Sequence, residues 1–194
     1  MQVAIVKYNA GNVESVKNAL NRLGVEPILT EDAETLKSAD RVIFPGVGEA
    51  SSAMNYLRER RLDTVIKSLQ QPVLGICLGM QLFCEFSEEN ETKCLGILPY
   101  LVRKFASETL KVPQMGWNNI FDLQSGLFAG IDEDSYVYFV HGYYVESGKE
   151  TIATCDYSVR FSAAVRHENF YAVQFHAEKS GATGAKILEN FLKI

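Results

Sequence analysis

The sequence predicts an α/β protein in which helices flank an open, mixed and mainly parallel sheet, with an antiparallel extension in the second half of the chain. Two observations lead to this fold class. In the first half, short apolar runs alternate with segments of helical periodicity, and in the second half strand-like segments follow one another across turns. Strands that helices separate pair in parallel and bury both faces of their sheet, whereas strands joined by turns pair in antiparallel.

The first half of the chain is expected to contain four strands. They are Val3–Tyr8, Val25–Thr30, Arg41–Phe44 and Pro72–Ile76. Helices are expected between and after these strands, where apolar residues recur at three- and four-residue intervals. The expected helices are 13–23, Ala33–Ser38, Ser51–Glu59, Leu62–Gln70, and Leu78 to about Phe86. Gly24 follows the first of them, at the place where a helix commonly stops.

The second half of the chain is expected to add strands and then one closing helix. The strand-like segments are Leu110–Phe121, Tyr136–Glu146, Thr151–Cys155, Ala163–Arg166 and Phe170–Phe175. The segment Ala182–Ile194 places its apolar residues on one stripe, so a helix there should dock against the sheet. Because the sequence contains no internal repeat and no linker, we expect one domain that spans residues 1–194.

Composition excludes several classes of protein. Hydrophobic residues make up 47% and charged residues 22% of the 194 residues, which is ordinary globular usage and not that of a disordered chain. Nineteen basic against twenty-four acidic residues give a net charge of -5, which argues against binding to nucleic acid phosphates. The longest apolar runs are far shorter than the roughly 20 residues of a membrane-spanning helix.

The N-terminus and the cysteines favour a cytoplasmic protein. The first residues lack the basic segment and small-residue cleavage site of a signal peptide, so we expect them to form a strand. The four cysteines contain no CxxC pair, which favours reduced thiols. Neither a metal-ligand motif nor a glycine-rich nucleotide loop is present, so no metal and no cofactor is expected.

The segment Gly75-Ile-Cys77-Leu-Gly79 predicts a nucleophilic cysteine. It lies where an apolar strand meets a helix, which is the setting of a nucleophile elbow. The helix that follows points its N-terminal amides at Cys77 and favours the thiolate, the reactive form of a thiol. The alternative is a buried structural thiol in a tight turn.

A nucleophilic thiol needs a base, and the sequence contains three histidines. His167 is expected in an exposed turn. His141 ends an apolar strand, where it could line a site or make a hydrogen bond at the strand end. His176 also ends a strand, and in an extended segment Glu178 would lie on the same side and orient the imidazole. A histidine at a strand end is by itself more often structural, but together with the cysteine elbow the pair favours a catalytic triad.

Acyl transfer further needs hydrogen-bond donors for an oxyanion. The backbone N–H of Leu78 follows the nucleophile directly, and the glycines of Pro45–Gly48 allow a peptide N–H to turn towards the site. An ordinary strand-to-helix loop explains Pro45–Gly48 equally well. The same glycines also permit the peptide to rest with its N–H turned away.

These segments resemble the motifs of triad-type glutamine amidotransferases. The resemblance rests on Gly-Ile-Cys77-Leu-Gly-Met-Gln81, Pro-Gly-Val-Gly48 and Phe-His176-Ala-Glu178-Lys-Ser. Three further segments resemble the glutaminase subunits of imidazole glycerol phosphate synthase and extend the similarity from end to end. They are Tyr8-Asn-Ala-Gly-Asn12, Val112-Pro-Gln-Met-Gly-Trp-Asn118 and Tyr138-Phe-Val-His141-Gly-Tyr-Tyr.

The resemblance implies a reaction and a site. Cys77 would attack the amide of glutamine and form a thioester, His176 would shuttle the proton, and Glu178 would hold His176. The amides of Val47 and Leu78 would form the oxyanion hole. The residues implied in glutamine binding are Gly46, Gln81, Glu89, Gly142 and Tyr143.

The resemblance also implies a partner, a (β/α)8-barrel cyclase that receives the ammonia in histidine biosynthesis. The residues implied at the partner surface are Asn12, Met115, Trp117, Tyr138 and Lys179. Their alternative interpretations are a helix cap for Asn12, core positions for Met115 and Trp117, and a solvated charge for Lys179. We expect the chain to be nearly inactive until the cyclase and its ligand are present.

The chain departs from the family pattern at three positions, and three other functions remain open. Ala177 replaces a proline, Gln114 a histidine and Gly142 a small hydroxyl residue, so rate, partner coupling and glutamine affinity are the properties at stake. The alternatives are a triad glutaminase that feeds pyridoxal phosphate, anthranilate or aminodeoxychorismate synthesis, a non-catalytic regulatory subunit, and a stress protein with a reactive elbow cysteine.

Overall fold

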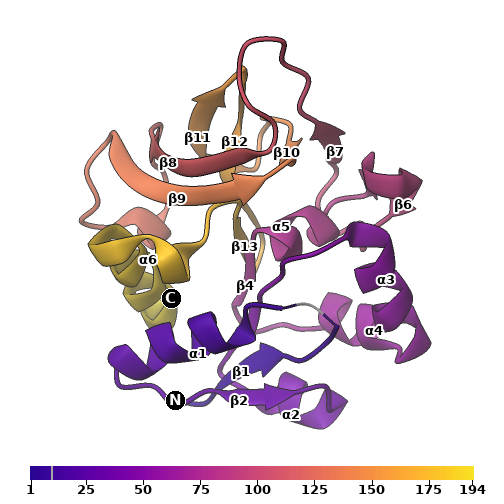
Figure 1. The fold of residues 1–194 in the computed structure, drawn as a ribbon. Coiled ribbons are helices and arrows are strands. Elements are labelled where there is room, and N and C mark those ends of the chain that lie inside the picture. Colours follow the sequence, from indigo (N-terminus) through magenta and orange to yellow (C-terminus); the bar gives the residue numbers. More distant parts are fainter. Residues whose placement is uncertain (10) are drawn as a thin grey trace.

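A central seven-stranded sheet organises the fold (Figure 1). The computed structural model describes residues 1–9 and 11–194. Along the sheet the strands follow the order β11-β12-β13-β4-β3-β1-β2. Their bounds are β1 Val3–Val6, β2 Ile28–Thr30, β3 Arg41–Phe44, β4 Val73–Ile76, β11 Thr151–Tyr157, β12 Val159–His167 and β13 Phe170–Val173. The strands from β13 to β2 pair in parallel, and β11, β12 and β13 pair in antiparallel.

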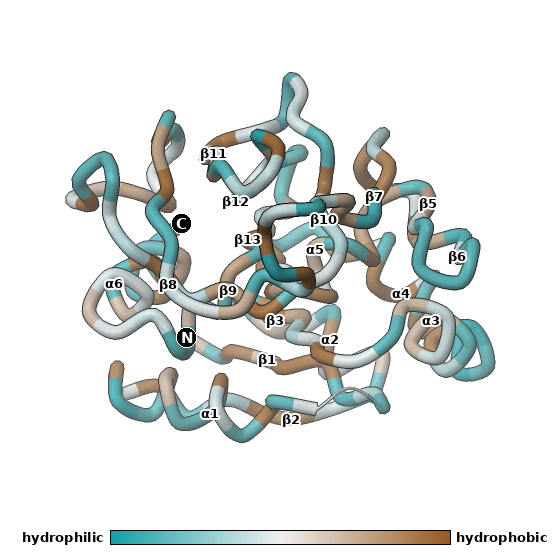
Figure 2. The backbone as a smooth tube through the Cα atoms, turned by 45° about the horizontal axis from the view of Figure 1, so that its top comes forward, coloured by the Kyte–Doolittle hydropathy of each residue, from teal (hydrophilic) through white to brown (hydrophobic). Residues whose placement is uncertain are grey.

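Helices cover both faces of this sheet. Their bounds are α1 Val13–Arg22, α2 Ala33–Ser38, α3 Ala50–Glu59, α4 Leu62–Lys67, α5 Leu78–Phe83 and α6 Gly181–Lys193, and short 3-10 turns span Glu89–Glu91, Gly126–Phe128 and Ala177–Lys179. Side chains alternate along a strand, so β1 sends Ile5 towards α1 and α6 and Val6 towards α2, α3 and α4. Each such fully buried side chain stabilises the fold by about 1.5–3 kcal/mol. Figure 2 shows β1 as one of the hydrophobic stretches in the middle of the molecule.

Two smaller sheets extend the structure. One has the order β10-β7-β5-β6, with β5 Phe86–Ser87, β6 Thr92–Lys93, β7 Leu101–Lys104 and β10 Tyr143–Val145. The other is an antiparallel ribbon of β8 Gln114–Ile120 and β9 Ser135–His141, which lies beside α6 (Figure 1). The predicted fold class, a mainly parallel sheet between helices with an antiparallel extension, is confirmed.

Some predicted boundaries are wrong, and the end of α5 has a tertiary cause. The helix expected to reach Phe86 ends at Phe83, because amides of Ile97 and Leu98 bind the Phe83 carbonyl and Glu85 donates its N–H to Tyr100. The strands β5, β6 and β7 of this region were not predicted at all. They are short and exist through pairing with one another.

Most predicted strands also have other bounds than expected, among them the strand expected over Ala163–Arg166, which covers Val159–His167. The strand expected over Val25–Thr30 covers only Ile28–Thr30, and that expected from Leu110 starts at Gln114, after a proline that lacks an N–H. The strand expected over Tyr136–Glu146 is interrupted at Gly142. There the chain passes from the β8–β9 ribbon to β10, and the Gly142 carbonyl accepts the N–H of Phe105.

Candidate active site

A cavity of about 550 Å³ brings together most of the residues that the sequence singled out. Cys77 follows β4 and His176 follows β13, and these two strands are parallel neighbours in the sheet. Their carboxyl ends therefore lie at the same edge, where α/β sheets usually bind ligands. Gln81, Glu89 and Tyr143 complete the lining from α5, the 3-10 turn that begins at Glu89, and β10.

Cys77 occupies a strained backbone position. Its φ of 53° and ψ of -106° lie in a region that residues with a side chain rarely adopt. The turn is compact because Gly79 has no side chain: a Cβ there would stand 2.0 Å from the carbonyl oxygen of Phe44. The Cys77 sulfur lies 3.7 Å from both the Val140 carbonyl oxygen and the Gln174 side-chain nitrogen. This geometry is that of a nucleophile elbow whose sulfur faces the cavity.

His176 and Glu178 form a buried pair next to Cys77. The Nδ1 atom of His176 lies 2.8 Å from Oε1 of Glu178. The two residues do not form the extended arrangement that we expected, because Ala177–Lys179 is a 3-10 turn in which Lys179 donates its N–H to the His176 carbonyl. The carboxylate reaches the imidazole through this turn.

The electrostatic surroundings of His176 favour its protonated form. Burial disfavours the imidazolium, but interactions with the Cys77 thiol and the Glu178 carboxylate outweigh burial and raise the pKa of His176 to about 10. With Nδ1 facing Glu178, the other ring nitrogen remains for proton exchange at the cavity. His176 thus interacts with both Cys77 and Glu178.

His141 has a different environment and lines the cavity as a neutral side chain. Its Nδ1 lies 2.7 Å from the Tyr143 carbonyl oxygen and its Nε2 lies 2.9 Å from Oε1 of Gln114. Burial lowers the pKa of His141 to about 4. His167, which we expected in an exposed turn, is the last residue of β12, and the turn follows it.

The two expected oxyanion donors are not brought together. The backbone N–H of Leu78 donates to the Gly46 carbonyl oxygen over 3.3 Å. Because the carbonyl and the N–H of a trans peptide point in opposite directions, the N–H of Val47 is directed away from Leu78. The buried Tyr8 hydroxyl donates to the neighbouring Pro45 carbonyl over 2.6 Å and holds this loop.

Four of the five residues expected to bind glutamine line the cavity, namely Gln81, Glu89, Gly142 and Tyr143. Gly46 does not line it; it packs against Tyr8 and Leu78. Gln81 donates to the Tyr143 carbonyl and to Gln174, over 3.1 and 3.0 Å. The carboxylate of Glu89 accepts the N–H of Ala50, and burial raises the pKa of Glu89.

Sequence reasoning missed Lys104, Val112 and Pro113, which also line the cavity. Lys104 lies opposite Tyr143 in the β7–β10 pairing, so its position depends on a strand that the sequence did not predict. The cavity therefore presents one acidic side chain, Glu89, together with Lys104 and Lys179. Opposite charges within one cavity suit a zwitterionic amino acid.

The residues expected at the partner surface differ in their exposure and in their contacts. Met115 and Trp117 are 59% and 55% exposed, which excludes the alternative that they are core residues. Trp117 lies beside Tyr138, with ring centroids 5.9 Å apart, and Lys179 is exposed at the cavity. Asn12 precedes α1 but its side chain does not cap that helix; it contacts Glu178 and His176 instead.

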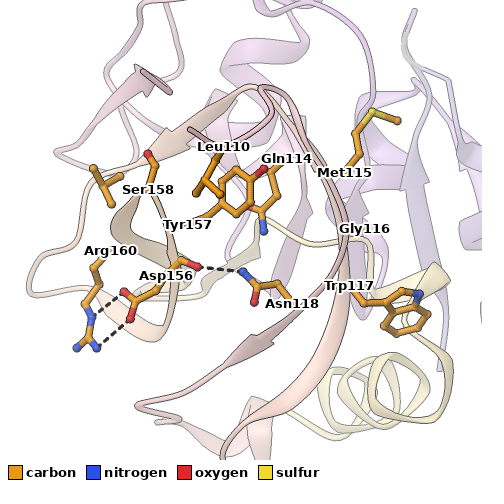
Figure 3. Close-up of a pocket in the computed structure, with 11 residues that line it drawn as sticks. Leu110, Gln114, Met115, Gly116, Trp117, Asn118, Asp156, Tyr157, Ser158 and Arg160 are labelled. Atoms are coloured by element: carbon orange, nitrogen blue, oxygen red, sulfur yellow. Dashed lines mark hydrogen bonds and ion pairs between the residues drawn. The ribbon is translucent and has the colours of Figure 1, made fainter. Parts of the chain in front are cut away.

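A second cavity of about 530 Å³ lies between β8 and the turn that joins β11 to β12 (Figure 3). Figure 3 shows Asn118 and Tyr157 on one side of β8, and Met115 and Trp117 pointing away on the other. The cavity contains neither Cys77 nor a histidine. It is therefore no candidate for the acyl chemistry.

Comparison with known proteins identifies the class. Residues 4–194 match the family described as "Glutamine amidotransferase class-I". The chain therefore belongs to the class-I glutamine amidotransferase family. Among solved structures, a glutamine amidotransferase covers 100% of this chain and 98% of its own, with a TM-score of 0.76 and 18% identity. The structure of PurLQS from Thermotoga maritima covers 99% and 97%, with a TM-score of 0.74 and 17% identity, and both show the shared fold.

Within that family the chain is similar to bacterial proteins named "Imidazole glycerol phosphate synthase subunit HisH". It is 57% identical over 196 residues to the protein of Bacteroides fragilis (strain YCH46), with 100% of both chains covered. It is 48% identical over 197 residues to the protein of Escherichia coli (strain K12), again with 100% of both covered. The expected kinship with glutaminase subunits of imidazole glycerol phosphate synthase is confirmed, as is the class of enzyme, a glutamine amidotransferase.

No helix over residues 1–9 and 11–194 combines the length and the hydropathy that crossing a membrane requires.

Proposed function

We propose that residues 1–194 act as one glutamine amidotransferase domain, which hydrolyses glutamine to glutamate at Cys77 and delivers the ammonia to a (β/α)8-barrel cyclase. The pair of subunits would form imidazole glycerol phosphate synthase in the cytoplasm and serve histidine biosynthesis. The observation that supports the chemistry best is the 2.8 Å contact of His176 with Glu178 at the cavity that Cys77 lines. The kinship with HisH subunits supports the choice of partner.

The first half of the reaction makes a thioester. The Cys77 thiolate attacks the amide carbon of glutamine, and the carbonyl electrons move to oxygen. His176, protonated at neutral pH because of its raised pKa, gives its proton to the amide nitrogen. The carbon–nitrogen bond then breaks, ammonia leaves, and the γ-glutamyl thioester remains on Cys77.

The second half regenerates the enzyme. His176, now neutral, takes a proton from water, and the oxygen of that water attacks the thioester carbon. The carbon–sulfur bond breaks, and Cys77 returns as the thiolate beside the His176 imidazolium. The new γ-carboxylic acid loses its proton to solvent and leaves as glutamate. Glu178 keeps the imidazole in one orientation throughout, because it accepts from Nδ1.

The tetrahedral oxyanion would be held by the N–H groups of Val47 and Leu78. In the structure the Gly46 carbonyl accepts a hydrogen bond from the Leu78 N–H. The Gly46–Val47 peptide must therefore rotate before both donors are free. This arrangement supports our expectation that the chain alone is nearly inactive. The cyclase with its ligand would favour the rotated peptide.

Glutamine would lie with its amide at Cys77 and its amino acid end near Glu89. The Glu89 carboxylate suits the α-ammonium group, and Lys104 suits the α-carboxylate. Gln81, Gly142 and Tyr143 would define the walls that hold the aliphatic part and the backbone. In this arrangement four of the five glutamine-binding residues implied by the resemblance would surround the substrate together with Lys104.

The cyclase would dock on the exposed face of the β8–β9 ribbon at Met115, Trp117 and Tyr138, with Lys179 at the cavity and Asn12 beside Glu178. Exposed aromatic and methionine side chains are typical of interface cores. An enclosed junction also serves the chemistry, because ammonia that meets bulk water at neutral pH becomes protonated and loses its nucleophilicity.

The decisive experiment is the variant Cys77→Ala in the complex with its cyclase. We expect no measurable glutamine hydrolysis and no glutamine-dependent imidazole product, with unchanged folding and cyclase binding, because the thiol adds little packing. Co-purification with the cyclase and circular dichroism check the last two points. Retained hydrolysis would refute the catalytic proposal, and hydrolysis that is absent in the unmodified complex as well would favour the alternative, a non-catalytic regulatory subunit.

A further inference from the structure

Glu178 is held by two hydrogen-bond donors on the same oxygen atom. One is Nδ1 of His176, at 2.8 Å, and the other is the side-chain amide of Asn12. The Glu178 side chain is fully buried, and within residues 1–9 and 11–194 its Oε2 atom has no hydrogen-bond partner. Asn12 is therefore the only described donor outside the His176 pair that fixes this carboxylate.

The backbone of Asn12 is arranged for this contact. Asn12 precedes α1 in the left-handed conformation, with φ of 72°, and its side chain makes no hydrogen bond to the helix that it begins. Asparagine at this position usually caps its own helix. Here the side-chain amide instead donates to Glu178, which lies 166 positions further along the sequence, and its nitrogen lies 3.5 Å from Nδ1 of His176.

We propose that Asn12 is a positioning residue of the catalytic triad, which acts by holding the Glu178 carboxylate against His176. The proposal rests on the proposed roles of Cys77, His176 and Glu178. A carboxylate with a single donor can rotate its two oxygens and draw the imidazole out of line, whereas a second donor on Oε1 fixes one orientation. The neutral amide supplies this donor and leaves the charge of the pair unchanged.

Asn12 takes no part in the lining of the glutamine cavity. A change at Asn12 should therefore lower the rate of the chemical steps and leave the affinity for glutamine nearly unaltered. This separates a positioning role from a binding role. It also distinguishes Asn12 from the cavity residues Glu89 and Lys104, whose loss should act through KM.

The test compares Asn12→Gly with the matched control Asn9→Gly, both in the complex at a saturating concentration of cyclase. Glycine tolerates the left-handed backbone of Asn12, so the variant removes the amide without new strain. Asn9 lies in the same connection but donates to Ser52, 2.9 Å away, and not to the triad. The control therefore adds the same chain freedom and removes a comparable amide.

We expect kcat of Asn12→Gly to fall by about ten-fold or more relative to Asn9→Gly, the scale of one lost hydrogen bond to a charged group, with KM within about two-fold. Inactivation of Cys77 by the glutamine analogue 6-diazo-5-oxo-L-norleucine should slow in parallel. Asn12→Asp should be slower than Asn12→Gly, because it places an anion against Glu178.

Equal kcat values for the two glycine variants would overturn the inference. A loss of activity that appears only as a higher KM for glutamine, or that a higher concentration of cyclase restores, would also overturn it. Full activity of Asn12→Asp would also overturn it, because that side chain cannot donate as the anion. These outcomes are separate from failure of the proposed function. If Cys77→Ala abolishes hydrolysis while Asn12→Gly matches its control, only the role of Asn12 is rejected.

Discussion

The backbone N–H of Leu78 donates to the carbonyl oxygen of Gly46, 3.3 Å away, directly beside the nucleophile. One of the two proposed oxyanion donors is thereby occupied. The other, the N–H of Val47, belongs to the same peptide as the Gly46 carbonyl and points in the opposite direction. The Tyr8 hydroxyl reinforces this arrangement through its hydrogen bond to Pro45. In the proposed mechanism the nucleophile Cys77 and the base His176 are thus in place, and the donors that would stabilise the tetrahedral intermediate are not.

From this relationship we predict a large difference between the free chain and the complex. Loss of one oxyanion donor lowers kcat by roughly 100- to 1000-fold in other acyl-transfer enzymes. We expect the free chain to hydrolyse glutamine slower than the complex with ligand-bound cyclase by about that factor. Steady-state glutamate production with and without cyclase and ligand measures it, and equal rates would show that the Gly46–Val47 peptide is no barrier.

A second prediction concerns the two buried histidines, whose pKa values should move in opposite directions. Partners raise the pKa of His176 to about 10, and burial lowers that of His141 to about 4. NMR titration of the imidazoles, assigned with His176→Gln and His141→Gln, measures both. Two titrations near the ordinary value of about 6.5 would contradict the electrostatic description.

The same shifts fix the sign of the pH dependence of stability. The raised pKa of His176 contributes stability that is complete below pH 6.5 and is lost as pH rises from there to about 10. The lowered pKa of His141 has the reverse effect, a loss of stability as pH falls from 6.5 to about 4. Urea unfolding of each glutamine variant should show a flatter dependence in its own pH window than the unmodified chain.

A third prediction tests how the cavity recognises the amino acid end of glutamine. Lys104→Met should raise KM for glutamine by about ten-fold, because it removes a cation that pairs with the α-carboxylate, and should leave kcat nearly unchanged. Lys104→Arg, which keeps the charge, should restore most of the affinity. Lys93→Met is the matched control, since Lys93 is exposed on β6 and does not line the cavity.

A substrate without the α-carboxylate makes the test of Lys104 specific. For 4-aminobutanamide, which keeps the amide and the amine, Lys104→Met and the unmodified enzyme should have similar kcat/KM values. If the variant loses as much activity on this amide as on glutamine, Lys104 acts on the fold or on the amide and not on the carboxylate.

What the sequence could predict was local. The elbow at Cys77 was recognisable because the glycines that permit it lie two positions away on either side, and the structure shows the steric need for Gly79. The alternation of β1, α1, β3 and β4 was likewise visible in apolar periodicity. Each of these elements can be predicted from the pattern of its own residues.

What the sequence could not predict depends on distant pairing. The strand β5 has two residues, so it has no measurable period, and it forms because Phe86 pairs with Leu101. Lys104 was missed for the same reason, because its strand β7 is defined by pairing. Asn12 was expected to face the partner, and its contact with Glu178 joins residues 166 positions apart.

The last prediction concerns the docking face. Trp117 is 55% exposed next to Tyr138, and large exposed aromatic side chains at an interface commonly contribute about 2 kcal/mol or more to binding. Trp117→Ala should therefore weaken cyclase binding by about 30-fold or more, measured by isothermal titration calorimetry, and leave the melting temperature of the free chain nearly unchanged. Val159→Ala is the control, because Val159 is 40% exposed at the start of β12, outside the β8–β9 ribbon, and lines the second cavity. Equal affinities of the two variants would move the docking surface away from the β8–β9 ribbon, whereas weakening by Val159→Ala alone would place it at the second cavity.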